Sequence, residues 1–348
     1  MRKATAGLKP YLVVQDTSVV KLNQNESPYD VPARLKNSVL DRLAKENWNR
    51  YPCHPPQQLI EDISRYTGHP QDGIVVGNSS NEIVMSALQA ICAPRNRMIV
   101  VSPGFPIYPR VGQILGLKII EVPLKKDFEF DIRAIKTAAR NAELVILASP
   151  NNPTGTALSV EQIGDLARQA EGIVVIDEAY YEFHQRTALG LLKKHKNLLI
   201  IRTLSKAFGL AGARIGYLLA GPEIAQSVEV TKLPFSVGIF QQAVGSLIIR
   251  NRKFQRRLIL QTVQQRNFVY SELKKIPLIH PIPSRANFIL FEIKNRPALE
   301  VFNALYQRGV LLRPLDHPKL KNTLRVTIGT PRENTTFLKA LKHVMQGP

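Results

Sequence analysis

The sequence predicts an α/β fold in which a large domain, built on a mostly parallel sheet of seven strands between helices, carries a smaller α+β domain. Three observations predict this fold. From about residue 74, short apolar runs rich in β-branched residues alternate with longer amphipathic stretches, which is typical of buried parallel strands joined by helices. The chain of 348 residues is too long for one small core. Its 44% hydrophobic and 21% charged residues are the balance of a globular protein.

The strands expected in the large sheet lie between residues 74 and 220. Each run is short enough to be a strand and is separated from the next by a stretch with helical periodicity. We therefore assign residues 45–255 to one large α/β domain. The seven runs are 74–76, 98–101, 118–122, 144–148, 173–176, 198–201 and 217–220.

The rest of the chain predicts the smaller α+β domain, made of residues 1–44 and 256–348. A long helix is expected over about 238–275, followed by strands at 286–292, 309–313 and 323–329. The first forty residues have no sheet pattern, and we expect them to wrap onto this smaller domain as an N-terminal arm.

Charge and cysteine content restrict the partners. Lys and Arg number 47 against 27 Asp and Glu, a net charge of +20, and such a field attracts small anions or polyanions. The densest basic run, 250–257, is also explained by a solvated helix face, and no zinc-finger or RNA-binding motif supports a nucleic-acid partner.

No apolar run could span a bilayer. With only Cys53 and Cys92, no signal peptide and no disulfide framework, we expect a cytoplasmic protein without a membrane partner.

Chemically useful side chains follow five of the predicted strands. Ligands of doubly wound sheets bind at the carboxyl ends of the strands, so these positions are the candidate site. Together they supply a Ser/Asn turn, an aromatic ring, an amide, a carboxylate and an amine. The segments are 77–82, 102–105, 149–155, 177–180 and 202–214.

Lys206 and Asp177 are the first candidates for chemistry. Lys206 follows an apolar strand and precedes a stretch of small residues, where its amine could form a Schiff base with a carbonyl cofactor. An ordinary surface lysine is the alternative. Asp177 could face a pyridine nitrogen and keep it protonated, which makes the ring an electron acceptor. It could instead only cap the helix that follows.

A phosphate site is indicated by Ser80, Asn81 and Arg214. The first two begin a predicted helix, whose backbone N–H groups bind anions, although a simple helix cap would use the same residues. Arg214, eight residues after Lys206, could add a forked contact. An amine, a partner for a pyridine nitrogen and a phosphate site together indicate pyridoxal 5′-phosphate.

Three motifs then carry a resemblance to a known family: 149–155, 177–183 and 202–214. On these residues the chain resembles the fold-type I pyridoxal-phosphate enzymes, aminotransferase class I/II, nearly from end to end. Within that family it is most similar to the histidinol-phosphate aminotransferase subgroup, on segments 8–11, 22–28, 49–52 and 323–330 together with Arg313.

The resemblance implies a role for each matching residue. Lys206 would carry the cofactor as a Schiff base and move a proton, Asp177 would pair with the pyridine nitrogen, and Tyr180 with Asn152 would hydrogen-bond the ring hydroxyl. Tyr51 would reach the phosphate from the neighbouring subunit of a homodimer. The implied catalytic residues are Lys206, Asp177 and Tyr180, and the cofactor-binding residues are Ser80, Asn81, Phe105, Asn152, Asp177, Tyr180, Ser205, Lys206, Arg214 and Tyr51.

The resemblance also implies a substrate site. Arg313 and Arg325 would bind the anionic group and Tyr11 would close over it; a surface ion pair is the alternative for either arginine, and a core phenylalanine is the alternative for Phe105 as a ring-stacking residue. The implied reaction converts histidinol phosphate and 2-oxoglutarate into imidazole-acetol phosphate and glutamate. A related amino-acid aminotransferase, a threonine-phosphate decarboxylase and, more remotely, a nucleic-acid-binding protein on the same fold stay open.

Overall fold

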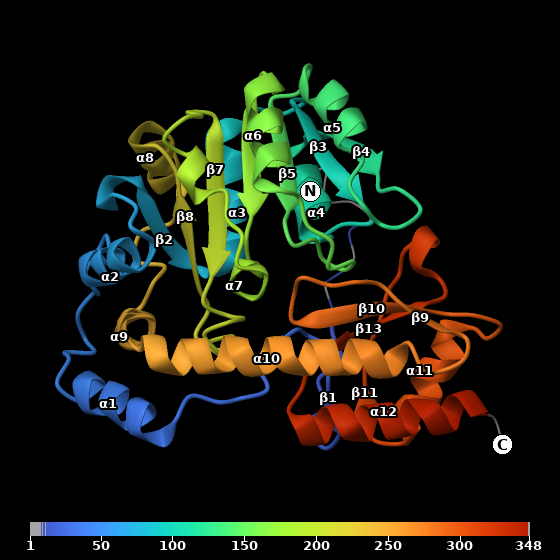
Figure 1. The fold of residues 1–348 in the computed structure, drawn as a ribbon. Coiled ribbons are helices and arrows are strands. Elements are labelled where there is room, and N and C mark those ends of the chain that lie inside the picture. Colours follow the sequence, from blue (N-terminus) through green and yellow to red (C-terminus); the bar gives the residue numbers. More distant parts are fainter. Residues whose placement is uncertain (1–7, 9, 11, 347–348) are drawn as a thin grey trace.

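The computed structural model describes residues 8, 10 and 12–346 (Figure 1). It contains one seven-stranded sheet, one four-stranded sheet and one two-stranded sheet. The seven-stranded sheet lies among helices in the upper part of the view, and the smaller sheets lie beside the long helix below it. The fold class expected from the sequence is therefore confirmed.

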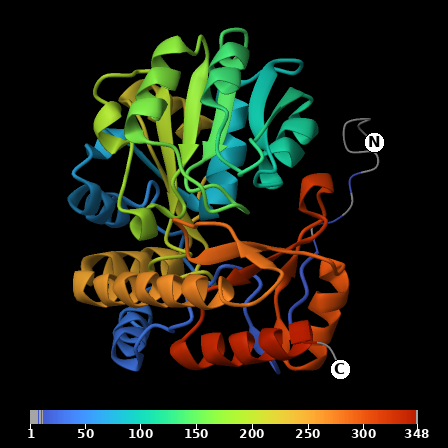
Figure 2. The ribbon, with the colours of Figure 1, turned by 45° about the vertical axis from the view of Figure 1, so that its right-hand side comes forward.

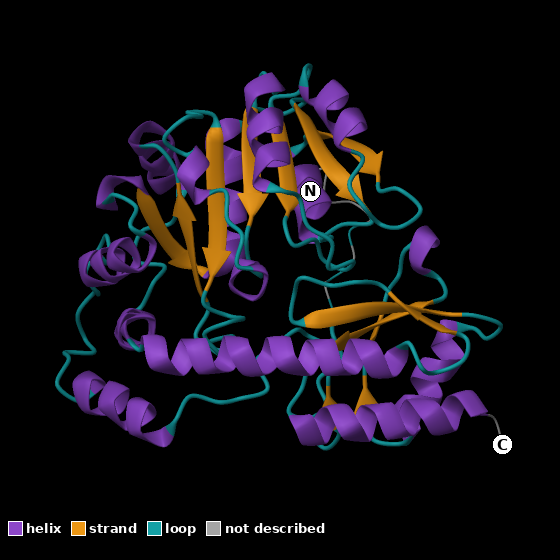
Figure 3. Ribbon diagram, viewed as in Figure 1, coloured by secondary structure: helices purple, strands orange, loops and turns teal. Residues whose placement is uncertain are grey.

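The large sheet contains all seven predicted strands. Its spatial order places the N-terminal strand β2 at one edge beside β8, which is antiparallel to both of its neighbours, whereas all other pairs are parallel (Figure 3). The strands, in sheet order, are β2 (Ile74–Asn78), β8 (Ile215–Leu219), β7 (Leu198–Thr203), β6 (Ile173–Asp177), β5 (Leu144–Ala148), β3 (Arg97–Ser102) and β4 (Lys118–Pro123).

Helices cover both faces of this sheet (Figure 2). In β5, Val145 and Leu147 face one hydrophobic core while Leu144 and Ile146 face another on the opposite side. Burial on both faces explains why the strands are continuous apolar runs rather than alternating ones. The helices are α1 (Ala33–Leu43), α2 (Gln57–Thr67), α3 (Ser79–Ile91), α4 (Ile107–Leu115), α5 (Ile132–Ala139), α6 (Val160–Gln169), α7 (Tyr181–His184), α8 (Pro222–Thr231) and α9 (Ile239–Arg250).

The four-stranded sheet is antiparallel and has its own core. Phe291, Val326 and Leu341 belong to a hydrophobic cluster separate from those of the large sheet. The strand order is β12 (Arg313–Pro314), β13 (Thr323–Thr327), β10 (Phe288–Ile293) and β9 (Ile279–Pro281). The flanking helices are α10 (Arg252–Leu273), α11 (Ala298–Gln307) and α12 (Pro331–Gln346).

The N-terminal segment contacts both parts of the molecule. β1 (Val20–Lys21) pairs in parallel with β11 (Val310–Leu311), whereas α1 places Leu35 and Val39 in a core of the large sheet. The division of the chain at residues 44/45 and 255/256 stays a prediction.

Two expected elements are wrong. The single strand over 309–313 is two short strands, β11 and β12, which belong to different sheets. The single helix over 238–275 is two helices, α9 and α10, interrupted at Asn251. Asn251 leaves the helical conformation, and its side chain accepts a hydrogen bond from the backbone N–H of Phe254 at 3.2 Å. Asparagine is a favoured N-cap residue, so it starts a new helix at this position. Across residues 8, 10 and 12–346, no helix combines the length and the apolar character needed to cross a bilayer.

Candidate active site

A cavity of about 330 Å³ lies at the carboxyl ends of the large sheet's strands and extends to the four-stranded sheet. This position is where doubly wound sheets bind ligands, and the volume is within the usual range for small-molecule sites. Its basic lining residues, Lys206, Arg214, Arg313 and Arg325, outnumber the single acidic one, Asp177. The cavity is therefore suited to an anionic ligand.

Eleven of the thirteen residues singled out from the sequence line this cavity. Tyr51 does not: it is 82% exposed and stacks on Phe235 with ring centroids 4.6 Å apart. Tyr11 lies outside the described residues. Those that the structure brings together are Ser80, Asn81, Phe105, Asn152, Asp177, Tyr180, Ser205, Lys206, Arg214, Arg313 and Arg325.

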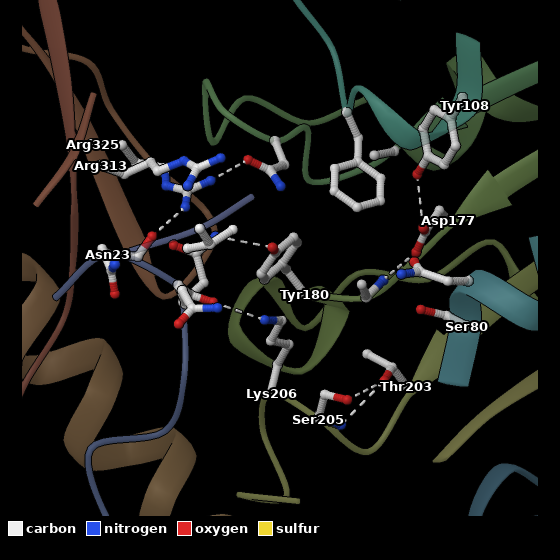
Figure 4. Close-up of a pocket in the computed structure, with 18 of the residues that line it drawn as sticks. Asn23, Ser80, Tyr108, Asp177, Tyr180, Thr203, Ser205, Lys206, Arg313 and Arg325 are labelled. Carbon is white, nitrogen blue, oxygen red and sulfur yellow. Dashed lines mark hydrogen bonds between the residues drawn. The ribbon is translucent and has the colours of Figure 1, made fainter. Parts of the chain in front are cut away.

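Lys206 follows β7 and points into the cavity (Figure 4). Its Nζ donates a hydrogen bond to the backbone oxygen of Gln24 at 3.1 Å. Burial, and next the positive charge of Arg325, lower the pKa of this amine to about 8. A larger fraction of the amine is therefore neutral near pH 7.5 than for an ordinary lysine, and the neutral form is the nucleophile.

Asp177 ends β6 and is 4% exposed. One carboxylate oxygen accepts from the Tyr108 hydroxyl at 2.7 Å, and the other accepts from the backbone N–H of Ala179 at 2.9 Å. Burial raises the pKa of this carboxyl to about 6, although both hydrogen bonds oppose the rise. Asp177 thus contacts the turn before α7, as expected if it only capped the helix that follows, and it also lines the cavity.

A cradle for an anion lies where α3 begins. Ser79 has a φ of 77°, and a Cβ added to Gly216 of β8 would lie 2.1 Å from the backbone nitrogen of Ser80. Only glycine therefore allows the start of α3 to pack this closely on the sheet. Ser205 lies beside this helix start, where its hydroxyl accepts from Thr203 at 3.0 Å and from the Arg214 guanidinium at 3.4 Å.

Tyr180 is held by the N-terminal segment. Its hydroxyl accepts a hydrogen bond from Nδ2 of Asn25 at 3.0 Å. Asn25 is 1% exposed and is itself held by Thr327 of β13 and by Asn287, whose amide donates to its backbone oxygen at 3.0 Å. A residue near the N-terminus therefore joins the large sheet to the four-stranded one at the cavity.

Arg313 and Arg325 face each other across neighbouring strands, β12 and β13. Arg325 donates to Oδ1 of Asn152 at 2.6 Å and to the backbone oxygen of Asn23 at 2.8 Å. Like charges directly opposite each other in a sheet are unfavourable unless an anion binds between them. Both side chains line the cavity together, so an anion-binding role fits better than two separate surface ion pairs.

The sequence reasoning missed several residues of the cavity. Tyr108 lies three residues after Phe105, within the first turn of α4, and this spacing could have indicated that both rings face the same site. In the sequence, Asn25 is distinguished only by its place in segment 22–28; its positive φ of 54° shows a turn that the sequence does not reveal. Asn23, Gln24 and Thr203 also line the cavity.

The donor set fits pyridoxal 5′-phosphate. Asp177 is a buried carboxylate whose hydrogen-bond donors, the Tyr108 hydroxyl and the Ala179 N–H, are both neutral, so a protonated ring nitrogen would suit it as a charged partner. The start of α3 packed on Gly216, with Ser205 and Arg214, would hold a phosphate. Lys206 would supply the amine that bonds to the aldehyde carbon. The residues present therefore fit the ring nitrogen, the phosphate and the aldehyde carbon of the cofactor.

Known proteins with similar sequences carry a consistent name. The chain is 37% identical to the histidinol-phosphate aminotransferase of Thermococcus kodakarensis over 342 residues, which are 98% of this chain and 97% of that protein. It is 34% identical to the histidinol-phosphate aminotransferase of Chlorobaculum tepidum over 327 residues, 93% of each chain.

Solved structures and a family comparison agree. The histidinol-phosphate aminotransferase of Sinorhizobium meliloti, solved in complex with pyridoxal-5′-phosphate, has the same fold, with a TM-score of 0.85 at 22% identity over 94% of this chain and 90% of that one. The sequence model for aminotransferase class I and II matches residues 17–341. With that match over most of its length, this chain belongs to the class I and II aminotransferase family.

Proposed function

We propose that this pyridoxal-phosphate-dependent aminotransferase moves an amino group from histidinol phosphate to 2-oxoglutarate, giving imidazole-acetol phosphate and glutamate. The observation that carries the proposal is the pair Arg313 and Arg325, side by side in the cavity that also contains the Lys206 amine. A guanidinium fork binds phosphate and carboxylate equally well, so one pair can serve both substrates in turn. The names of the relatives with 34% and 37% identity support the same substrate.

The cofactor, when bound, supplies a protonated ring that accepts electrons from the carbon next to the substrate nitrogen. Asp177 would keep the ring nitrogen protonated, because its carboxylate is buried and its hydrogen-bond donors are neutral groups. Phe105 would lie against the ring face. Asn152 and Tyr180 would direct hydrogen bonds to the ring hydroxyl. These assignments are proposals that rest on the lining of the cavity.

Lys206 would perform the proton transfer. When it is not bonded to the cofactor, its Nζ would take the proton from the substrate carbon and return it at a different atom. A pKa lowered to about 8 suits this role, since a general base works best when its pKa is near the working pH. The positive charge of Arg325 contributes to this lowering after burial.

Spectroscopic titration tests the substrate pair. We expect the absorbance band of the Lys206-bound cofactor to convert into that of pyridoxamine phosphate when either histidinol phosphate or glutamate is added, because each can donate its amine. Conversion by glutamate but not by histidinol phosphate would leave an aminotransferase and refute the proposed substrate. Release of CO₂ from threonine phosphate without a keto acceptor would favour the decarboxylase alternative.

We further propose a homodimer in which Tyr51 of the partner subunit completes the phosphate site. Tyr51 does not line the cavity of its own chain. It stacks on Phe235, and segments 48–51 and 230–240 together expose several large apolar side chains, which is typical of an interface. They are Trp48 (75% exposed), Val230 (80%), Leu233 (72%), Phe235 (42%) and Phe240 (47%).

Sedimentation and cofactor retention test this arrangement. The wild type is expected to sediment as a dimer, and Tyr51→Phe to remain a dimer but release the cofactor about threefold to tenfold faster, since it loses one hydrogen bond to an anion. Tyr306→Phe, which alters a tyrosine on α11, is the matched control and should release it at the wild-type rate. A wild-type monomer with full activity would refute the proposal.

A further inference from the structure

A hydrogen bond joins the large sheet to the loop that follows Arg313. Ser102 is the last residue of β3, and its Oγ lies 2.9 Å from Nε2 of His317. His317 precedes the short 3₁₀ helix Pro318–Leu320, in the segment between β12 and β13. Figure 2 shows this orange-red segment rising from the smaller sheet toward the large one.

The tautomer of His317 follows from its second contact. The backbone N–H of Lys319 donates to Nδ1 at 3.1 Å, so Nδ1 carries no proton. In the neutral ring the proton is then on Nε2, which donates to Ser102 Oγ. A ring in this state cannot accept the serine proton, which excludes a Ser–His nucleophile and leaves a structural bridge.

An apolar contact reinforces the bridge. Phe128, from the segment between β4 and α5, and Leu315 both pack against an apolar cluster that contains Leu320, so residues before and after His317 contribute to it. The backbone oxygen of Phe128 accepts a hydrogen bond from Thr156 at 2.9 Å, which ties this segment to the turn that carries Asn152. The loop after Arg313 is thus held at two places, one polar and one apolar.

The bridge connects the two walls of the active-site cavity. Phe105 lies three residues after Ser102 on one wall, and Arg313 lies four residues before His317 on the other. We infer that His317 is a positioning residue: by donating to Ser102 it holds the Arg313 loop against the end of β3 and sets the distance at which Arg313 meets the anionic group of the substrate. The inference rests on the proposed function for its kinetic part only.

The charges around His317 are consistent with a neutral ring. Glu121 on β4 and Asp316 favour protonation, Lys319 opposes it, and burial, the largest effect, lowers the pKa of His317. Protonation would turn Nδ1 into a donor facing the Lys319 N–H and so weaken the turn. The bridge should therefore be intact at neutral and basic pH.

Steady-state kinetics test the positioning role. We expect His317→Ala and Ser102→Ala each to raise KM for histidinol phosphate and for glutamate about threefold to tenfold, the range of one lost hydrogen bond, with kcat within about twofold of wild type. The double variant should be no worse than the worse single one, because both remove the same bond. His317→Gln, whose amide nitrogen can replace Nε2, should recover most of the loss. Unchanged KM in both single variants, or additive losses, would overturn the inference.

A matched control variant, and a measurement that does not depend on turnover, allow the role of His317 to be tested separately from the proposed substrate. His343→Ala, at an exposed histidine of α12, should leave KM unchanged. In protein labelled with ¹⁵N-histidine at pH 8, the signal lost in His317→Ala should show protonated Nε2 and bare Nδ1. The opposite tautomer would refute the bridge whatever the substrate. If the tautomer is as expected but the enzyme does not use histidinol phosphate, the proposed substrate is wrong and the proposed bridge stands.

Discussion

Replacing Lys206 by alanine is expected to lower amino transfer at least about a thousandfold, the largest effect of any single change in this protein. The variant loses both the amine that bonds to the cofactor and the base that moves the proton, and each of these contributes strongly to such reactions. Lys206→Arg should be equally inactive, because it restores the charge but neither function. Single-turnover formation of the keto product measures the loss.

Two controls make this result specific to the amine. Lys274→Ala removes an exposed lysine at the end of α10 and should retain wild-type turnover. Thermal unfolding of Lys206→Ala should show a folded protein, because a buried amine with a lowered pKa does not stabilise the fold. Turnover within tenfold of wild type in a folded Lys206→Ala protein would remove Lys206 from the mechanism.

Asp177→Asn is expected to lower turnover at least about a hundredfold while making the cofactor-free protein more stable. The amide keeps the shape of the side chain but cannot hold a proton on the ring nitrogen, so the ring accepts electrons poorly. The amide oxygen can keep the hydrogen bond from the Ala179 N–H, and the amide nitrogen can donate to the Tyr108 hydroxyl in place of the bond that the second carboxylate oxygen accepts, so the fold should persist. Near-normal activity in this variant would refute the assigned role.

The gain in stability should depend on pH in a defined direction. The pKa of Asp177 is raised from 3.8 to about 6 in the folded protein. Between these two pH values the folded state holds a proton that the unfolded state has released. The buried charge therefore costs stability above about pH 6 and costs nothing below pH 3.8. Asp177→Asn removes this cost. The free energy of unfolding of the cofactor-free variant should therefore exceed that of the wild type by about 1–3 kcal/mol at pH 7.5, and the two should not differ in this way near pH 4. An equal difference at both pH values would contradict the explanation.

The cavity contains charged groups that reduce the stability of the ligand-free protein. Burial raises the pKa of Asp177, so its charged form is unfavourable in the folded protein, and Arg313 lies directly opposite Arg325 on the neighbouring strand, where like charges repel. Burying such groups costs free energy unless they are paired. Asp177 would thus gain from a cationic ring nitrogen beside it, and the two guanidinium groups that line the same cavity would attract a phosphate or carboxylate.

Much of the fold could be predicted because local pattern and burial coincide in this chain. Strands such as β5 and β7 are covered on both faces, so each is a continuous apolar run that is easily recognised. The break at Asn251 could not be predicted from periodicity, because the apolar pattern of α9 continues into α10 and only the capping geometry interrupts it. The two-residue strand β1 is too short to have a pattern and exists through its pairing with β11.

The sequence by itself identified the candidate site residues. Each follows a strand or a turn whose type is readable locally, and parallel strands bring their carboxyl ends to one edge; they are Lys206, Asp177, Asn152, Tyr180 and Arg214. Only the tertiary structure decided what holds these groups. Asn25 meets Tyr180 across 155 positions of the chain, and Ser102 meets His317 across 215. Contacts at such separations depend on how the two sheets pack together, and no local pattern records that packing.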